Sequence, residues 1–416
     1  MGLAVVVLLA LGAIVGSSLA LSVPTAVSAH LASRPAASHA TLTGRVLVSA
    51  PPAGAKGPDD LTLLSVPGVD HGRPVLWTAY QNGINPDGTP GSTGGPTQST
   101  LVGYDQATGQ IVRSINVTGK IDGLVADPAM NAILATVNED DNSRFNVVYP
   151  ALGAVATYSY APNPAYQGVG GTDSIAVWDG QIYVAHSNPA NTAQATEYVV
   201  TLRTATLTAQ LTPLFYDDSG ATSATNGTAV TLGLTDPDTN LAMPASSARF
   251  GGDLATISQG DGEIIFAHGV GHAVSLQVLR LTDNVSGNVP PADGLTVQTC
   301  SSGTLYVVDS GTNEIWAFGV HATSTGTIYI GEPNDNSNPL VGTLNPMTGK
   351  ITPFGNHFVS PKGLLFVGSC GSHGGAGEDG HGHGQSQGDH DQGQGDDDSH
   401  GQNGHEGWDD SAITAD

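Results

Sequence analysis

The chain repeats one pattern of apolar and polar positions. An apolar run meets a turn that contains Gly, Asp or Asn, and a second run of β-branched and aromatic residues follows and ends in a polar cluster. The second runs are PVLWTAYQNG (74–83), NAILATVNED (131–140), GQIYVAHSN (180–188), GEIIFAHGVG (262–271) and GTLYVVDSG (303–311). Because no helical period of useful length interrupts these runs, the pattern predicts an all-β protein.

The spacing of the runs narrows the architecture. Two further stretches, 99–117 and 338–358, share Leu-Val-Gly, a Thr-Gly turn and a following strand. Antiparallel repeats spaced by about 40 to 60 residues are typical of a β-propeller, whereas the competing parallel β-helix has shorter and more regular coils. We predict six blades, with seven as the alternative because 313–354 can be divided in two ways. A strand at 41–49 is expected to join the final blade beside GLLFVGS (363–369) and to close the ring.

Two of these segments resemble known repeat families. LYVVDSGTNEIWAF (305–318) resembles an NHL-type repeat, in which a strand ending in Val-x-Asp-Ser/Thr-Gly-x-Asn leads into a strand reading Ile-x-x-Phe. YDQATGQIVRSINV (104–117) is similar to the Asp-x-x-Thr-Gly-x-Val segments of secreted YVTN-type surface propellers. The resemblance implies a six- or seven-bladed propeller. It also implies a function as a binding module more often than as a lyase, lactonase or dehydrogenase.

Charge excludes several classes of partner. The chain of 416 residues carries 12 Lys+Arg against 37 Asp+Glu, a formal net charge of -25. Nucleic acids and anionic lipid surfaces are recognised by basic faces, so neither is an expected partner. We expect a monomer that recognises a small molecule, a glycan or a protein.

The two ends of the chain differ from the propeller body (61–370). Residues 1–29 open with an apolar run and close on Val27-Ser28-Ala29, which predicts a signal peptide and a location outside the cytoplasm or in the cell envelope. The alternative is an uncleaved N-terminal anchor. A Pro/Ala-rich segment (30–60) follows the signal. Residues 371–416 are rich in His, Asp and Gly without an apolar period, so this tail is predicted to be disordered.

Two cysteines remain after export. An oxidising compartment favours a disulfide between Cys300 and Cys370, which would pin the closing segment of the ring. Two separate buried thiols are the alternative.

Candidate ligand contacts follow the second run of each repeat. In the propellers that the chain resembles, these loops open on one face around the channel mouth. The predicted rim comprises Gln81, Asn138, Glu139, His186, His268 and Asp309. Two imidazoles and a carboxylate at one mouth could bind a divalent metal or act as acid and base. The alternative is that these loops are polar because they are solvated.

The tail offers a second candidate site. Neutral imidazole is a good ligand for Zn, Ni or Cu, and glycine spacers let several rings meet one ion. The predicted ligands are His373, His381, His383, His390, His400 and His405. The alternative is a tail that only keeps the protein solvated.

No motif in the chain requires catalysis. The propeller body (61–370) lacks the Gly-x-Ser-x-Gly elbow, a Walker-type loop and a Cys-x-x-Cys-His site. The sequence therefore favours an exported binding protein over an enzyme. The alternatives are a metal-dependent hydrolase or lactonase with its ion at the channel mouth, and a structural surface-layer component.

Overall fold

The computed structural model of the chain describes residues 42–165, 170–189, 195–247, 249–271, 273–283, 289–322, 324–334, 339–355 and 358–370. The predicted signal peptide (1–29) and the predicted metal-binding tail (371–416) lie outside these residues. Besides strands, the described residues form two short 3-10 helices, η1 (Asp70–Gly72) and η2 (Thr204–Thr206). No helix in this part of the chain has the length and hydropathy of a membrane span.

Blades 1 to 3 are each built from four consecutive antiparallel strands. Blade 1 consists of β2 (Pro58–Ser65), β3 (Pro74–Tyr80), β4 (Gln98–Asp105) and β5 (Ile111–Thr118). Blade 2 consists of β6 (Ile121–Asp127), β7 (Ala132–Val137), β8 (Arg144–Tyr149) and β9 (Ala154–Ala161). Blade 3 consists of β10 (Thr172–Trp178), β11 (Gln181–His186), β12 (Ala195–Arg203) and β13 (Thr208–Tyr216). Parallel pairing of β13 with β9 joins the outer edges of blades 2 and 3 into one eight-stranded sheet.

Blade 4 carries an additional hairpin at its outer edge. Its four main strands are β16 (Pro237–Ala242), β17 (Leu254–Ser258), β18 (Glu263–His268) and β19 (Ser275–Arg280). The insertion that begins after blade 3 forms β14 (Gly220–Ser223) and β15 (Ala229–Thr231). Because β14 pairs in parallel with β19, this insertion widens blade 4 before the chain enters its inner strand.

The strands of blades 5 and 6 alternate along the chain, so neither blade is built from four consecutive strands, and we call this arrangement the strand exchange. Blade 5 contains β20 (Gly294–Val297), β23 (Ile328–Glu332), β24 (Leu340–Leu344) and β25 (Ile351–Gly355). Blade 6 contains β26 (Pro361–Gly368), β21 (Ser302–Asp309), β22 (Glu314–His321) and β1 (Thr43–Val48). The N-terminal strand therefore joins the final blade, as expected. It pairs with β22 at the outer edge, however, rather than lying beside 363–369.

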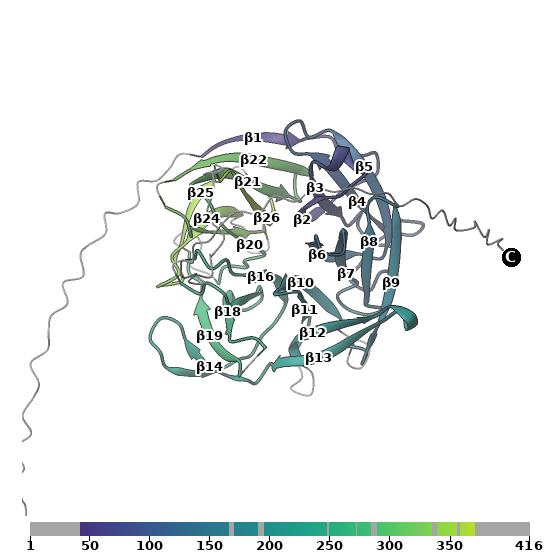
Figure 1. Cartoon of the computed structure of the whole chain (residues 1–416). Coiled ribbons are helices and arrows are strands. Elements are labelled where there is room, and N and C mark those ends of the chain that lie inside the picture. Colours follow the sequence, from purple (N-terminus) through teal and green to yellow (C-terminus); the bar gives the residue numbers. More distant parts are fainter. Residues whose placement is uncertain are drawn as a thin grey trace, which may run out of the picture. The chain divides into compact units, whose positions relative to one another are not determined.

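The inner strands form a closed ring around the channel (Figure 1). Neighbouring pairs contact one another in the order β2, β6, β10, β16, β20, β26 and back to β2. One apolar cluster fills each of the six boundaries between blades; Trp77 and Ile133, for example, pack between blades 1 and 2. The protein is thus a six-bladed β-propeller. The seven-blade alternative is wrong.

Burial explains the strand composition. Strand β7 is buried at every position because both of its faces pack against neighbouring blades, so it reads as a continuous apolar run. Tight turns carry the residues that positive φ requires. Asp179 and Gly180 have φ of 49° and 70° and connect the paired residues Trp178 and Gln181, as in a two-residue type I′ hairpin.

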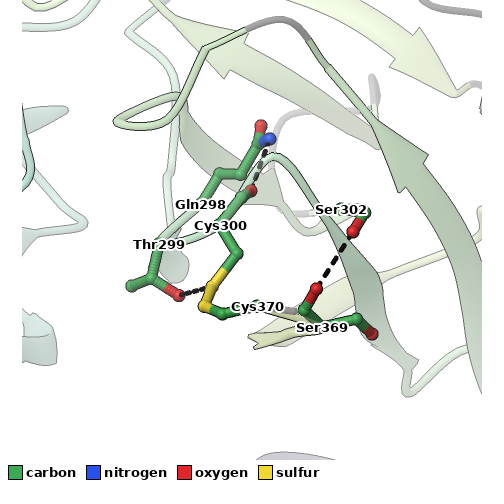
Figure 2. The surroundings of a disulfide bond; sticks show 6 residues. All are labelled: Gln298, Thr299, Cys300, Ser302, Ser369 and Cys370. Carbon is green, nitrogen blue, oxygen red and sulfur yellow. Dashed lines mark hydrogen bonds between the residues drawn. A yellow bond between two sulfur atoms is a disulfide. The ribbon is translucent and has the colours of Figure 1, made fainter. Parts of the chain in front are cut away.

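A disulfide joins Cys300 to Cys370, the pair favoured by the sequence (Figure 2). The Cα atoms are 5.4 Å apart, and the two residues are separated by 70 positions in sequence. Cys300 lies in the loop through which the chain leaves blade 5 for blade 6, and Cys370 lies two residues beyond the end of β26. The bond therefore links the two ends of the segment that contains the strand exchange.

Candidate ligand-binding site at the mouth of the channel

The six inner strands begin with the same short pattern. An apolar or small residue is followed by a charged residue and then, in most blades, by a small residue. The starts read PDDL (58–61), IDGL (121–124), TDSI (172–175), PDTN (237–240), ADGL (292–295) and PKGL (361–364). The charged residues are Asp59, Asp122, Asp173, Asp238, Asp293 and Lys362, and we call them the charged ring. Because the inner strands of a propeller run in one direction along the channel, these positions meet at one end of it.

The small third residue has a steric cause. A Cβ added at Gly123 would lie 2.5 Å from the carbonyl oxygen of Asp173 in the next blade. The same relation holds at Gly294, whose added Cβ would lie 2.1 Å from the carbonyl oxygen of Lys362. At the equivalent position of blade 4, the Thr239 hydroxyl donates a hydrogen bond to the carbonyl of Asp293. Adjacent inner strands therefore approach closely at the charged ring, which brings its side chains together.

Two lysines neutralise part of the ring. Lys362 Nζ lies 2.9 Å from Asp59 Oδ1 and 3.0 Å from Asp293 Oδ2, so it links blade 6 to blades 1 and 5. Lys120 precedes β6, and its Nζ lies 2.7 Å from Asp122 Oδ1 and also contacts Glu139 Oε1. Burial lowers the pKa of each lysine, but the adjacent carboxylates outweigh burial and hold both pKa values well above the ordinary range. Both ammonium groups are therefore charged.

The carboxyl groups of the ring are crowded. Burial raises the pKa of Asp173 well above its usual range, and the next largest contribution comes from the Asp238 carboxylate. Burial and the Asp293 carboxylate raise the pKa of Asp238 in the same way. Such crowding of buried carboxyl groups disfavours further negative charge and favours positive charge.

A cavity of about 450 Å³ opens over the ring. Its lining is almost wholly polar and contains no aromatic side chain: Asp59, Gln81, Pro86, Lys120, Asp122, Glu139, Asp140, Ser187, Asn188, Thr235, Asp236, Asp238, Gln259 and Lys362. Below the ring, the inner strands enclose a narrower space of about 180 Å³ with many aliphatic side chains. Polar side chains are therefore concentrated at the mouth.

Two of the predicted rim residues line this cavity. Gln81 Nε2 donates hydrogen bonds to the carbonyl of Ile121 at 3.1 Å and to Asp122 Oδ1 at 3.3 Å. Glu139 contacts Lys120, as described above. Asn138 lies directly behind them, where its Oδ1 accepts from the Lys120 backbone N–H at 2.9 Å and its Nδ2 donates to the carbonyl of Asn142. Its amide therefore organises the wall of the cavity.

Two further predicted residues have buried structural contacts. His186 is fully buried; its Nδ1 accepts from the Asn188 N–H at 3.0 Å, so Nε2 carries the proton that it donates to the Pro164 carbonyl at 2.9 Å. Its sequence neighbours, rather than its ring, line the cavity. Asp309 is also fully buried, and its carboxylate accepts backbone N–H groups, including those of Val359 and Ser360 at 2.9 Å. Both contacts hold loops at the mouth.

His268 requires a correction. It ends β18, the third strand of blade 4, whereas the other rim residues follow second strands. Successive strands of a blade are antiparallel, so His268 lies at the end remote from the cavity, where its Nδ1 is 2.7 Å from Asp253 Oδ1. Gln259, which follows the second strand, occupies the expected place and lines the cavity. The prediction for His268 was wrong because the inner strand β16 reads PDTNLA and lacks a strand-like apolar run, so the third strand β18 looks like a second strand in the sequence.

Metal ligation receives no support from the described residues. They contain no group of three or more His, Cys, Asp or Glu side chains that could hold a metal ion. The predicted ligands His373, His381, His383, His390, His400 and His405 lie outside the described part of the chain, so metal binding by the tail stays a prediction.

Comparisons with known proteins assign no family to the chain. No family model matches it, and no curated protein does. A periplasmic gluconolactonase of Pseudomonas aeruginosa, PpgL, aligns over 75% of this chain and 88% of its own at 13% identity and a TM-score of 0.43. A putative 6-phosphogluconolactonase of Bacteroides fragilis aligns over 74% and 86% at 12% identity and a TM-score of 0.39. The β-propeller domain of Myceliophteria thermophila Cps50 aligns over 70% and 81% at 13% identity and a TM-score of 0.34.

These similarities concern the course of the backbone only, and nothing about the residues of the site follows from them. The activities in those names belong to those proteins, and the resemblance to NHL-type and YVTN-type repeats stays a prediction. The fold and the site define a six-bladed β-propeller with a charged, hydrophilic cavity at the channel mouth.

Proposed function

We propose that the protein is an exported binding module that takes a small hydrophilic molecule into the mouth cavity. The observation that carries this proposal is the lining. Charged and amide side chains surround about 450 Å³, and no aromatic ring is available for stacking. Small-molecule sites are concave and use a few converging polar groups to fix the ligand. Here polar groups make up nearly the whole wall, so the ligand must satisfy them with hydrogen bonds.

Export is supported by the disulfide and by the acidic balance of the chain. Disulfides persist in oxidising compartments, and the bond between Cys300 and Cys370 closes the blade exchange. The net charge of -25 disfavours polyanionic ligands, since such a ligand would meet repulsion both at long range and in the cavity. The ligand class is therefore neutral or cationic.

The test is a comparison of retained ligands. Full-length protein is incubated with an extract of polar metabolites, separated from unbound molecules by gel filtration and analysed by mass spectrometry. Asn188→Trp places a large side chain at an exposed position of the cavity wall, and Thr206→Trp places the same side chain on an exposed position of η2. We expect small hydrophilic molecules to be retained by the wild type and by Thr206→Trp and lost from Asn188→Trp.

Equal retention by all three proteins would overturn the proposal. The hydrolase alternative predicts a different result, because an enzyme consumes its substrate. Adding glucono-δ-lactone and following acid release in a pH-stat separates the two functions, and acid release that Asn188→Trp abolishes would favour the hydrolase.

A further inference from the structure

Two lysine ammonium groups at the mouth are held in one repeated way. Each lysine Nζ lies between two carboxylates: Lys362 between Asp59 and Asp293, and Lys120 between Asp122 and Glu139. Such charge-assisted contacts require only two oxygens near one nitrogen and no fixed coordination geometry. Carboxylates at the mouth thus already contact two primary ammonium groups.

One sector of the ring lacks such a partner. Asp173 and Asp238 occupy the equivalent positions of blades 3 and 4, and no ion pair to either residue is present among the described side chains. Asp173 is fully buried, and neither of its carboxylate oxygens has a hydrogen-bond partner in the described structure. Against the effect of burial, the Lys120 ammonium and, more weakly, a contact with Asp173 lower the pKa of Glu139, and two carboxyl groups share a hydrogen bond only through a proton. Burial and the neighbouring carboxyl groups keep a proton on Asp173 until a cation favours its ionised form.

The buried Asp173 carboxyl group lies behind the cavity wall. The charged groups that most affect Asp173 are Asp238, Glu139, Asp122 and Lys120, and all four line the cavity. Asp236 lines the cavity beside them. A cation placed at Asp238 would therefore contact a carboxyl group of the wall and would favour the ionised forms of Asp238 and of the buried Asp173 behind it.

We propose that the sector formed by Asp238 and Asp173 binds the primary ammonium group of the ligand, so that the ligand is a small hydrophilic amine. This inference rests on the proposed function, because it specifies the ligand of the same cavity. A metal ion fits the sector less well, since the described residues provide no group of three ligands for one. An ammonium ion matches the contacts that Lys120 and Lys362 make in the neighbouring sectors.

The probe is 1,4-diaminobutane, and its neutral counterpart is 1,4-butanediol. Isothermal titration of the full-length protein at low salt should show binding of the diamine at least tenfold tighter than that of the diol. Asp238→Asn removes the wall carboxylate and should weaken diamine binding at least tenfold. Asp173→Asn removes the ionisable group behind it and should weaken binding severalfold. Asp179→Asn is the matched control, because Asp179 is exposed in the turn at the far end of the same inner strand.

The remaining outcomes separate the two proposals. Equal diamine affinity in the wild type, Asp238→Asn and Asp179→Asn would show attraction to the acidic surface only and would overturn the inference. Retained neutral molecules that Asn188→Trp excludes, with no preference for diamine over diol, would overturn the inference and leave the proposed function standing. If Asp238→Asn does not fold, Asn188→Trp replaces it, because a filled cavity must also abolish diamine binding. Failure of every hydrophilic probe and extract to bind at the mouth would overturn both proposals.

Discussion

Blades 1 to 4 and blades 5 and 6 reach the same architecture by different routes. In blades 1 to 4 the four main strands of each blade follow one another in sequence, so each blade can form from local contacts. After β20 in blade 5 the chain forms β21 and β22 of blade 6, returns to blade 5 for β23, β24 and β25, and then adds β26 to blade 6. Blade 6 also needs β1 from the other end of the described chain. Contacts between distant segments carry a larger loop-closure cost. The disulfide and the Lys362 ion pairs both lie in this part of the ring, where the chain needs extra links.

Removing the disulfide is expected to have the largest effect. Replacing Cys300 and Cys370 together by Ser should lower the free energy of unfolding by about 4 kcal/mol, because the bond closes a long loop in the unfolded chain. The measurement is guanidinium unfolding without reductant. Hydrogen exchange should rise first in β20, β21 and β26, which flank the exchange. Ser369→Ala, next to Cys370, is the control. A loss below 1 kcal/mol would show that the exchanged strands hold without the bond.

The two buried lysines give the second test. Lys362 links three blades, whereas Lys120 contacts carboxylates of blade 2 only. Lys362→Met should lower the free energy of unfolding at pH 7.5 by about 3 kcal/mol, because it leaves buried carboxylates without a partner. Burial already raises the pKa of Asp293. A carboxyl group with a raised pKa in the folded state takes up a proton as the pH falls, and the protonated group no longer needs the lysine. The loss in free energy of unfolding caused by Lys362→Met should therefore shrink as the pH falls to 5.

Urea unfolding at both pH values and hydrogen exchange distinguish the lysines. Lys362→Met should increase exchange in β2, β20 and β26, and Lys120→Met should increase it in β6 and β7 alone. The same exchange pattern in both variants would mean that Lys362 does not specifically hold the closure.

The sequence predicted the fold from its second strands. These strands are buried on both faces, so they appear as apolar runs of β-branched and aromatic residues, and their spacing indicated a propeller. The exchange between blades 5 and 6 was not predictable in this way. Strand β20 is followed directly by β21 in sequence, yet it pairs with β23, and only three-dimensional packing selects that partner.

The sequence located part of the site. Gln81 and Glu139 were found because they follow second strands at the mouth. The charged ring was missed because Asp-Gly in IDGL and ADGL normally marks a hairpin turn, whereas here it begins an inner strand. Aligning the six strand starts reveals the ring, since the charged residue and the small residue after it recur in register. Which carboxylates remain unpaired depends on where Lys120 and Lys362 reach, and spacing does not encode that.

The boundary between blades 3 and 4 offers the third test, in the part of the ring without exchanged strands. Glu197 is fully buried there; its Oε1 accepts from Asn240 Nδ2 at 2.8 Å and its Oε2 accepts from Thr256 Oγ1 at 3.1 Å. Burial raises its pKa to about 8, although both hydrogen bonds act in the opposite direction. The folded chain therefore keeps this proton at pH values where the unfolded chain, with a carboxyl pKa of about 4.3, has released it.

The sign of the effect follows from proton binding. Between pH 4.3 and 8 the folded state binds one more proton than the unfolded state, so this group lowers stability as the pH rises. Glu197→Gln keeps an acceptor for Asn240 and a polar group for Thr256 but does not titrate. Between pH 6 and 7.5 we expect the free energy of unfolding to fall by roughly 2 kcal/mol less in the variant than in the wild type. Denaturant unfolding across this range measures the difference, with Glu314→Gln in blade 6 as the control. Parallel pH profiles for the wild type and Glu197→Gln would show that Glu197 is ionised within the fold, and the boundary between blades 3 and 4 would then need a cation that the described residues do not supply.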